Sequence, residues 1–307
     1  MSSVFFQAVA ATIIASSIPL ILAAIGELVA ERSGMLNLGV EGMMLMGAVC
    51  GFIGAYFSGS TLVGALCGVA AGIAMAGLYG LLTIGFAVNQ VAAGLALTIF
   101  GQGLSGLVGA HFVGLKRDGA PHLRLPWLSD LPYVGHMLFG EDGFVYVAVA
   151  LVAGVAWFLR SSRAGLDLRA VGDNPASAHA LGMSVGGIRL LAVLFGGGCA
   201  GLSGAYLTLA YTPFWSPGLS AGRGWIALAL VVFASWKPWR VVLGALLFGG
   251  ATILQLQAQA LGIRLPSQML SALPYVVTIL ALILLNLRRN RGSLTPAALG
   301  QPFVADT

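Results

Sequence analysis

Long apolar runs separated by short polar stretches follow one another along almost the whole chain. A helix needs roughly 20 mostly apolar residues to cross a bilayer, and the runs reach that length repeatedly. No long polar segment divides them, so we expect one all-α transmembrane bundle over residues 1–307. The pattern predicts about nine spans, at 4–26, 35–57, 61–84, 88–112, 143–160, 188–212, 222–236, 240–259 and 270–287.

The composition supports a membrane protein. Hydrophobic residues make up 58% of the chain and charged residues 8%, with a mean hydropathy of +0.95, whereas about 25% of residues are charged in soluble domains. The 44 glycines are spread through the apolar runs, where small residues let helices approach closely. In span 188–212 we interpret Gly196, Ala200 and Gly204 as a packing face. The three cysteines lie in apolar segments without metal-ligand spacing, so we interpret them as packing residues.

The positions of the basic residues orient the spans. Cytoplasmic loops carry an excess of Lys and Arg, and such residues gather in 160–189, in the "WKPWR" turn and after the last span. This predicts an outside N-terminus, a cytoplasmic C-terminus and an extracytoplasmic loop at 113–142, where charges are mixed. The first residues lack a basic region and a small-residue cleavage site, so we expect a retained span. The basic residues are Arg160, Arg163, Arg169, Arg189, Lys237, Arg240, Arg288, Arg289 and Arg291.

The loop at 161–187 contains signals for a short ordered helix. Asp173 or Asn174 can cap its N-terminus, Pro175 suits its first turn, and Gly182 can end it. A helix of about two turns is marginal in water unless it packs against something, and its side chains are mostly small. A helix lying on lipid headgroups is the alternative, but such helices carry large apolar residues on one face and Lys or Arg on the other. We therefore expect it to dock into a protein groove.

The stretch "GELVAERSGMLNLGVEGMMLMGA", residues 26–48, places charges in an otherwise apolar region. Charge in hydrocarbon is unfavourable by several kcal/mol, and the glycines beside Asn37 weaken a helix, so we expect span 35–57 to be broken beside a polar cavity. Asn37 and Glu41 are four residues apart and would share a helix face. Glu41 is interpreted as the one deep carboxylate, either on a substrate path or paired with Arg32 or across a subunit interface. Glu27, Glu31 and Arg32 are expected at the cytoplasmic surface, where they pack or pair locally.

Other polar and aromatic residues allow two readings each. Asn89, Gln90 and Gln102 in span 88–112 either face the same path or hydrogen-bond within the bundle. Tyr211 and Trp215 either contact an extracytoplasmic protein or anchor the membrane interface. A path lined by amides and apolar walls suits a neutral polar ring compound.

Three segments resemble one family of transport proteins. The sequence "GLDLRAVGDNPASAHALG", Gly165 to Gly182, resembles the coupling loop of ABC importer permeases of the branched-chain amino acid, ribose and nucleoside group. The stretch from Gly26 to Ala48 and "GRGWIALALVVFASWKPWRVVLGALLFG", Gly222 to Gly249, resemble the nucleoside-type permeases. The resemblance implies that residues of this loop couple to an ATPase, namely Gly172, Asp173, Asn174, Pro175, Ala176, Ala178, Ala180 and Gly182.

The resemblance also implies partners and a location. Such a permease pairs with a second, non-identical permease in the bacterial cell membrane, is powered by a cytoplasmic ATPase, and receives its solute from an extracytoplasmic lipoprotein. Nucleosides are the first expectation for that solute, and a simple sugar such as ribose is the alternative. The sequence contains no G-x-x-x-x-G-K-[ST] phosphate loop, so ATP would be used by the partner, and no cofactor, metal site or catalytic residue is expected in this chain.

Functions of other classes are also considered. A secondary transporter usually buries several ionisable groups, whereas here we find one deep carboxylate and no histidine clearly inside a span. A membrane enzyme is disfavoured because no H-E-x-x-H or G-x-S-x-G motif occurs. A channel is compatible with the composition alone.

Overall fold

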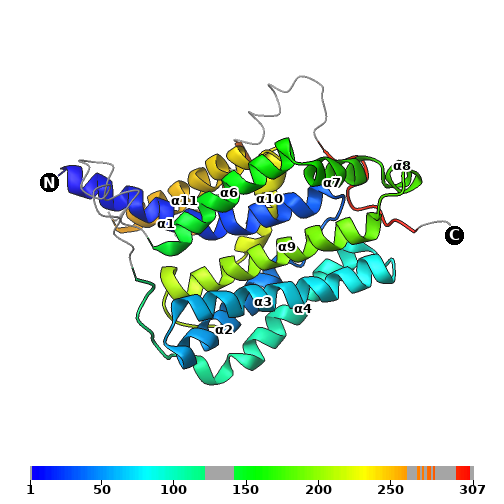
Figure 1. Cartoon of the computed structure of the whole chain (residues 1–307). Coiled ribbons are helices and arrows are strands. Elements are labelled where there is room, and N and C mark those ends of the chain that lie inside the picture. The colour runs from blue at the N-terminus through cyan, green and yellow to red at the C-terminus, as the bar shows by residue number, and fades with distance from the viewer. Residues whose placement is uncertain are drawn as a thin grey trace.

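The computed structural model describes residues 2–121, 142–260 and 295–304, together with a few isolated residues between 268 and 280. These parts are almost entirely helical (Figure 1), and the only β contacts within them are two isolated bridges. Seven of the helices are long and apolar enough to cross a membrane. The elements are α1 (Ser2–Arg32), α2 (Val40–Ser58), α3 (Thr61–Gly80), η1 (Leu81–Gly85), α4 (Gln90–Val108), η2 (Ala110–Phe112), α6 (Gly143–Ser161), α7 (Arg163–Asp173), α8 (Pro175–Ala180), α9 (Val185–Tyr206), η3 (Leu207–Tyr211), α10 (Arg223–Phe233) and α11 (Pro238–Ala260).

Eight of the nine predicted spans contain a helix, with two differences in length. Helix α1 continues to Arg32, beyond the predicted end at residue 26. Helix α10 has 11 residues, about 16 Å at 1.5 Å per residue, which is half the roughly 30 Å of bilayer hydrocarbon. The prediction of a full span at 222–236 is therefore wrong. Most of the ninth predicted span, 270–287, and most of the predicted outer loop, 113–142, lie outside the described residues.

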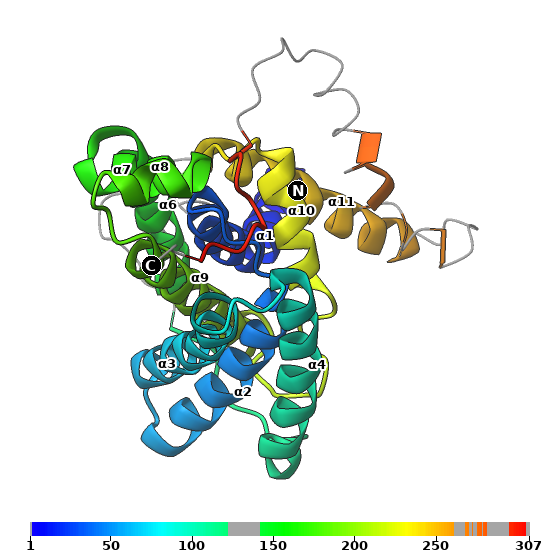
Figure 2. The ribbon, with the colours of Figure 1, turned by 90° about the vertical axis from the view of Figure 1, so that its right-hand side faces the viewer.

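The centre of the bundle is formed by α9, which packs against α1, α2 and α3 (Figure 2). Backbones touch at these crossings, because a Cβ added to any of five glycines would overlap the facing helix. We call Gly47, Gly72, Gly197, Gly201 and Gly204 the glycine spine. Close backbone approach through small residues is the usual way helices associate in lipid, so the predicted packing face on span 188–212 is confirmed.

The remaining helices surround this centre. Helix α4 packs on α2, while α6, α10 and α11 pack on α1. Helices α7 and α8 lie at one end of the bundle, beside the C-terminal segment (Figure 1). Trp215, expected to anchor the membrane interface or contact another protein, is fully buried and packs against Gly109. Residues 212–222 connect the end of η3 to the start of α10, and within them Trp215 and Ser220 are buried.

Candidate functional site

Residues 33–39 form a non-helical connection between α1 and α2 that is buried inside the protein. Helix α2 begins only at Val40, not at residue 35, and is continuous to Ser58, so the structure shows a later helix start and no break within the span. Backbone polar groups at such a position need partners from within the protein. Asn37 is 0% exposed, so its surroundings are supplied by the chain itself.

Five side chains from four helices bind the backbone of this connection, and we call this arrangement the buried junction. The contacts run from Asn37 N to Glu27 Oε1 (3.0 Å), Leu36 N to Gln90 Oε1 (2.7 Å), Tyr79 Oη to Leu36 O (2.6 Å), Thr98 Oγ1 to Leu38 O (2.9 Å) and Arg189 Nε to Ser33 O (3.3 Å). The Asn37 side chain turns back on the connection, where its Oδ1 accepts from Gly39 N at 3.0 Å. The polar side chains of this region therefore form hydrogen bonds with backbone N–H and C=O groups that the non-helical connection leaves without helical partners.

Two acidic residues near the C-terminal end of α1 are buried within the protein. Glu27 and Glu31 are each 1% exposed, so Glu41 is not the one deep carboxylate. Trp236 Nε1 donates to Glu31 Oε2 at 2.6 Å, and Arg32 Nη2 donates to the Trp236 carbonyl at 3.2 Å. Trp236 is thus a buried partner that joins the α10 to α11 turn to the end of α1.

The Glu41 carboxylate lies on the N-terminus of α10. Its Oε1 accepts from Ser220 Oγ at 2.5 Å and from Gly222 N at 2.8 Å, and its Oε2 accepts from Gly224 N at 2.6 Å. A carboxylate at a helix N-terminus satisfies unpaired N–H groups and interacts favourably with the helix dipole. Gly222 has a φ of +81°, and a Cβ on Gly224 would lie 2.6 Å from the Glu41 Cα. The "GRG" sequence therefore fits this contact, which is neither of the expected pairings of Glu41.

A cavity of about 150 Å³ lies beside the start of α10, between α1 and α11. Arg223 lines it, donates to the Leu219 carbonyl at 3.4 Å and lies 5.3 Å from the centre of the Tyr211 ring. Leu20 lies near the middle of α1 and Phe248 near the middle of α11, so the cavity lies about halfway along these two helices. Sequence reasoning missed it, although Thr252 and Gln255, three residues apart in an apolar run, were a signal. The lining residues are Ser16, Leu20, Ala221, Arg223, Ile226, Phe248, Thr252, Gln255 and Tyr275.

The five predicted path residues do not meet in one cavity among the described residues. Asn37 and Gln90 belong to the buried junction, and Glu41 holds α10. Asn89 caps α4 through a 3.0 Å bond from Ala92 N. Gln102 is exposed on the outward face of α4.

The segment 161–187 contains two helices, of which α8 was predicted and α7 was missed. Asn174 Oδ1 accepts from Ser177 N at 2.9 Å, Pro175 is in the first turn, and Gly182 follows the helix with a φ of +82°. These local signals are confirmed. Asp173 does not cap α8, because it is the last residue of α7. The signal for α7 was Ser162, whose Oγ accepts from Gly165 N at 2.9 Å.

Helix α8 has an inner and an outer face. Ala178 is 3% exposed and packs against Val171 and Val185, so it belongs to the inner face. Gly172 is also buried, because its Cα faces the Arg32 carbonyl. The outer face is formed by small side chains and one large one, namely Ala176, Ala180 and Leu181, the last 82% exposed.

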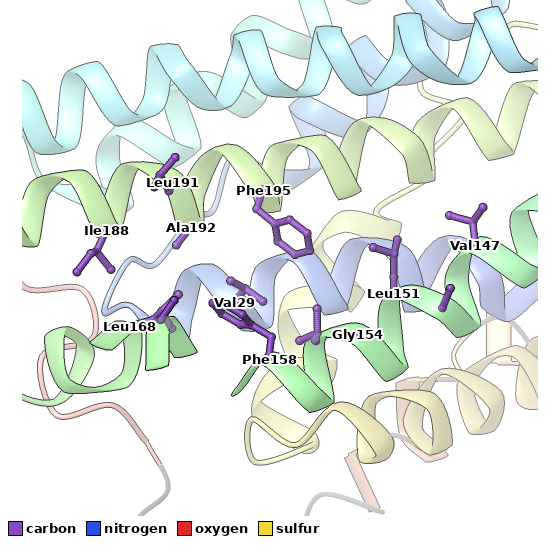
Figure 3. Close-up of a pocket in the computed structure, with 13 residues that line it drawn as sticks. Val29, Val147, Leu151, Gly154, Phe158, Leu168, Ile188, Leu191, Ala192 and Phe195 are labelled. Carbon is purple, nitrogen blue, oxygen red and sulfur yellow. The ribbon is translucent and has the colours of Figure 1, made fainter. Parts of the chain in front are cut away.

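A large groove in the described part of the chain is apolar. It has a volume of about 620 Å³ and lies between α6 and α9, with Val29 of α1 at its floor and Leu168 of α7 at one end (Figure 3). Every lining residue is aliphatic, Phe or Gly, so the groove offers no side-chain hydrogen bond to a polar solute. We therefore place the candidate site at the start of α10, where polar groups are present.

Comparison with known proteins identifies the family. A model of the branched-chain amino acid transport system / permease component family matches residues 9–282. The chain is 40% identical to the putative glucose ABC transporter permease protein TsgC13 of Haloferax volcanii, over 95% of this chain and 96% of that protein. It is 31% identical to the nucleoside ABC transporter permease protein NupC of Lactococcus lactis subsp. cremoris (91% and 92%), and 30% identical to the guanosine ABC transporter permease protein NupQ of Bacillus subtilis (93% and 93%).

Two of these organisms each contain a second permease that the chain matches more weakly. These are NupP of B. subtilis, 28% identical over 76% of this chain and 70% of that protein, and TsgB13 of H. volcanii, 25% identical over 78% and 69%. The family match covers most of the residues, and the bundle contains seven helices long enough to cross a membrane. The chain is a multi-pass membrane protein that belongs to the branched-chain amino acid transport system / permease component family of ABC transporters.

Proposed function

We propose that the chain is one of two non-identical permease subunits of an ATP-driven importer. The observation that carries this proposal is helix α8, whose inner face packs on the protein through Ala178 while its outer face of Ala176 and Ala180 is exposed at one end of the bundle. A short helix with small outward side chains fits into a groove on another protein. We assign that groove to a cytoplasmic ATPase, because the sequence contains no phosphate loop of its own.

The α8 end of the bundle would then face the cytoplasm. In the structure Lys237 and Arg240 lie just beyond Trp236, which binds the end of α1, and Gly172 packs against that same end of α1. The basic residues of two separate loops therefore gather at one end, which is the distribution that the positive-inside rule requires of the cytoplasmic side. The N-terminus would be outside.

We place the substrate path at the start of α10. Transporters commonly bind solutes near the middle of the bilayer, beside helices that begin or end there, and α10 does so next to the cavity that Arg223 lines. A volume of about 150 Å³ is smaller than the roughly 300–1,000 Å³ of a complete ligand pocket, so the second permease would supply the other wall. Gln102 and Asn89, exposed on α4, remain candidates for the same path, whereas Asn37, Gln90 and Glu41 would support it from behind.

The solute would be a neutral, hydroxyl-bearing compound delivered by an extracytoplasmic lipoprotein. The higher identity to a permease named for glucose favours a simple sugar. Two relatives named for nucleosides or guanosine favour a nucleoside. Hydroxyl groups are common to both, and the Ser, Thr, Gln and Arg side chains of the cavity can hydrogen-bond them.

Uptake by the reconstituted complex tests the proposal. Proteoliposomes with both permeases, the ATPase and the binding protein are expected to accumulate labelled glucose, ribose or nucleoside only when ATP is supplied inside. Gln255→Leu is expected to lower uptake, whereas Gln257→Leu, on the same helix but outside the cavity, should not. Uptake driven by a proton gradient without ATP would refute the importer and favour a secondary transporter.

A further inference from the structure

The described C-terminal segment, residues 295–304, lies between the α7 and α8 helices and the buried junction, as the red trace of Figure 2 shows. Its backbone joins the two. Ala298 N donates to the Gly172 carbonyl at the end of α7, and Gly300 N donates to the Gly34 carbonyl at the end of α1, both at 3.0 Å. Ala298 is 4% exposed, so this segment is part of the packed protein.

One carbonyl of the segment binds two further helices. The backbone carbonyl oxygen of Gln301 accepts hydrogen bonds from Arg189 Nη1 at 3.1 Å and from Gln90 Nε2 at 3.4 Å. Arg189 belongs to α9 and Gln90 to α4, and both side chains also bind the 33–39 connection. A displacement of Gln301 would therefore act on the first turns of α9 and α4 together.

The segment ends on the inner face of α8. Phe303 packs with the apolar cluster of Val171, Ala178 and Val185, and its ring lies 5.6 Å from the ring of His179. Helix α8 has only six residues, too few to be stable without packing. Phe303 thus forms part of the base on which α8 rests.

We propose that residues 295–304 act as a coupling strap, which transmits displacement of α8 to α4 and to the buried junction. The covalent chain leads from α8 only to α6, through α7, and to α9. The strap binds Gln90 of α4 through Gln301, and it adds a link to the 33–39 connection beside the contacts of Gly172 in α7 and Arg189 in α9. The connection leads directly into α2, which carries Glu41. Coupling of this kind travels through packed groups and hydrogen bonds that move together. The proposal rests on the assignment of α8 as the ATPase contact.

The test is the amount of solute taken up per ATP hydrolysed by the reconstituted complex. Phe303→Ala removes the contact with α8 and leaves the backbone bonds of Ala298 and Gly300 in place. We expect uptake per ATP to fall at least about fivefold, the lower range of measured coupling between sites, while subunit stoichiometry and ATP hydrolysis persist. Val304→Ala, at a neighbouring side chain that is 69% exposed, should match the wild type. Phe303→Leu, which restores apolar packing, should recover most of the loss.

Two results would overturn the strap. One is a Phe303→Ala complex that is less stable to heat but has the wild-type ratio of uptake to hydrolysis, because the segment would then only support the fold. The other applies if Phe303→Ala fails to assemble, and it is a milder truncation, Phe303→Val, that assembles and has the wild-type ratio of uptake to hydrolysis. A wild-type complex that does not use ATP would refute the proposed function itself, and this result is separate from both.

Discussion

Replacing Glu41 with Gln is expected to destabilise the protein, and we do not expect it to remove a contact with the transported solute. The Glu41 carboxylate accepts three hydrogen bonds, from Ser220, Gly222 and Gly224, and the residue is 7% exposed. A Gln amide keeps one oxygen and presents an NH₂ group where the other oxygen accepted. At least one N–H or O–H group of the α10 start then loses its acceptor, and the helix dipole loses its counter-charge.

The size of the effect follows from these contacts. A hydrogen bond to a charged group contributes about 1.5–3 kcal/mol, and an anion at a partly buried helix N-terminus contributes up to about 2 kcal/mol. These contributions overlap, so we expect a loss of roughly 3 kcal/mol in the free energy of unfolding. At about 2–4 °C per kcal/mol, the value for chains of 150–250 residues, the midpoint of thermal unfolding should fall by roughly 6–12 °C.

The assay is thermal unfolding of the purified complex in detergent, with all variants scanned at one rate because membrane proteins often unfold irreversibly. Asp118→Asn makes the same chemical change at an exposed position and is expected to shift the midpoint by less than about 2 °C. Glu41→Asp keeps the charge with a shorter reach and should fall between the two. If Glu41→Gln unfolds at the wild-type temperature and assembles normally but does not transport, the capping role is wrong and Glu41 belongs to the solute path.

Two further predictions use matched pairs of small residues. Ala180→Glu, on the exposed face of α8, is expected to leave the unfolding midpoint unchanged and to lower uptake per ATP. Ala178→Glu, at a site 3% exposed, should lower the midpoint because it buries a charge. Equal uptake per ATP in Ala180→Glu and wild type would refute the docking face. Gly204→Ala adds a methyl group against the backbone of Met44 and should destabilise the bundle by about 1–3 kcal/mol, measured by the same thermal scan. Gly103→Ala, whose added methyl group meets no atom within 4 Å, should not destabilise it. Equal midpoints for these two variants would count against close packing at the glycine spine.

Local signals in the sequence predicted the structure well where the interacting residues are close in the chain. Asn174 caps α8 by accepting a hydrogen bond from Ser177, which is only three residues further along the chain. The cap could therefore be inferred from the sequence. The apolar runs located the helices for the same reason, since length and hydropathy are properties of one segment. The short length of α10 could not be inferred, because its start is fixed by Glu41, which is 181 residues from Gly222.

The hydrogen-bond partners of the buried charged residues could not be predicted from the sequence. Glu27 accepts a hydrogen bond from the Asn37 backbone, and Glu31 accepts one from Trp236, 205 residues away; the sequence identified neither partner. Trp215 gave the pattern of a membrane anchor and is fully buried. In each case the outcome depends on which distant segment folds against the residue, and a single sequence does not contain that information.

The glycine spine has a consequence for how the protein can change shape. Where backbones touch, as at Gly47 and Gly201, two helices cannot slide past each other without separating first. Helices α1, α2, α3 and α9 should therefore keep one mutual arrangement through a transport cycle, and conformational change should occur between this unit and α4, α6, α10 or α11. Pairs of spectroscopic labels within the unit would then serve as a fixed ruler, against which labels on the outer helices report the distance that each one travels.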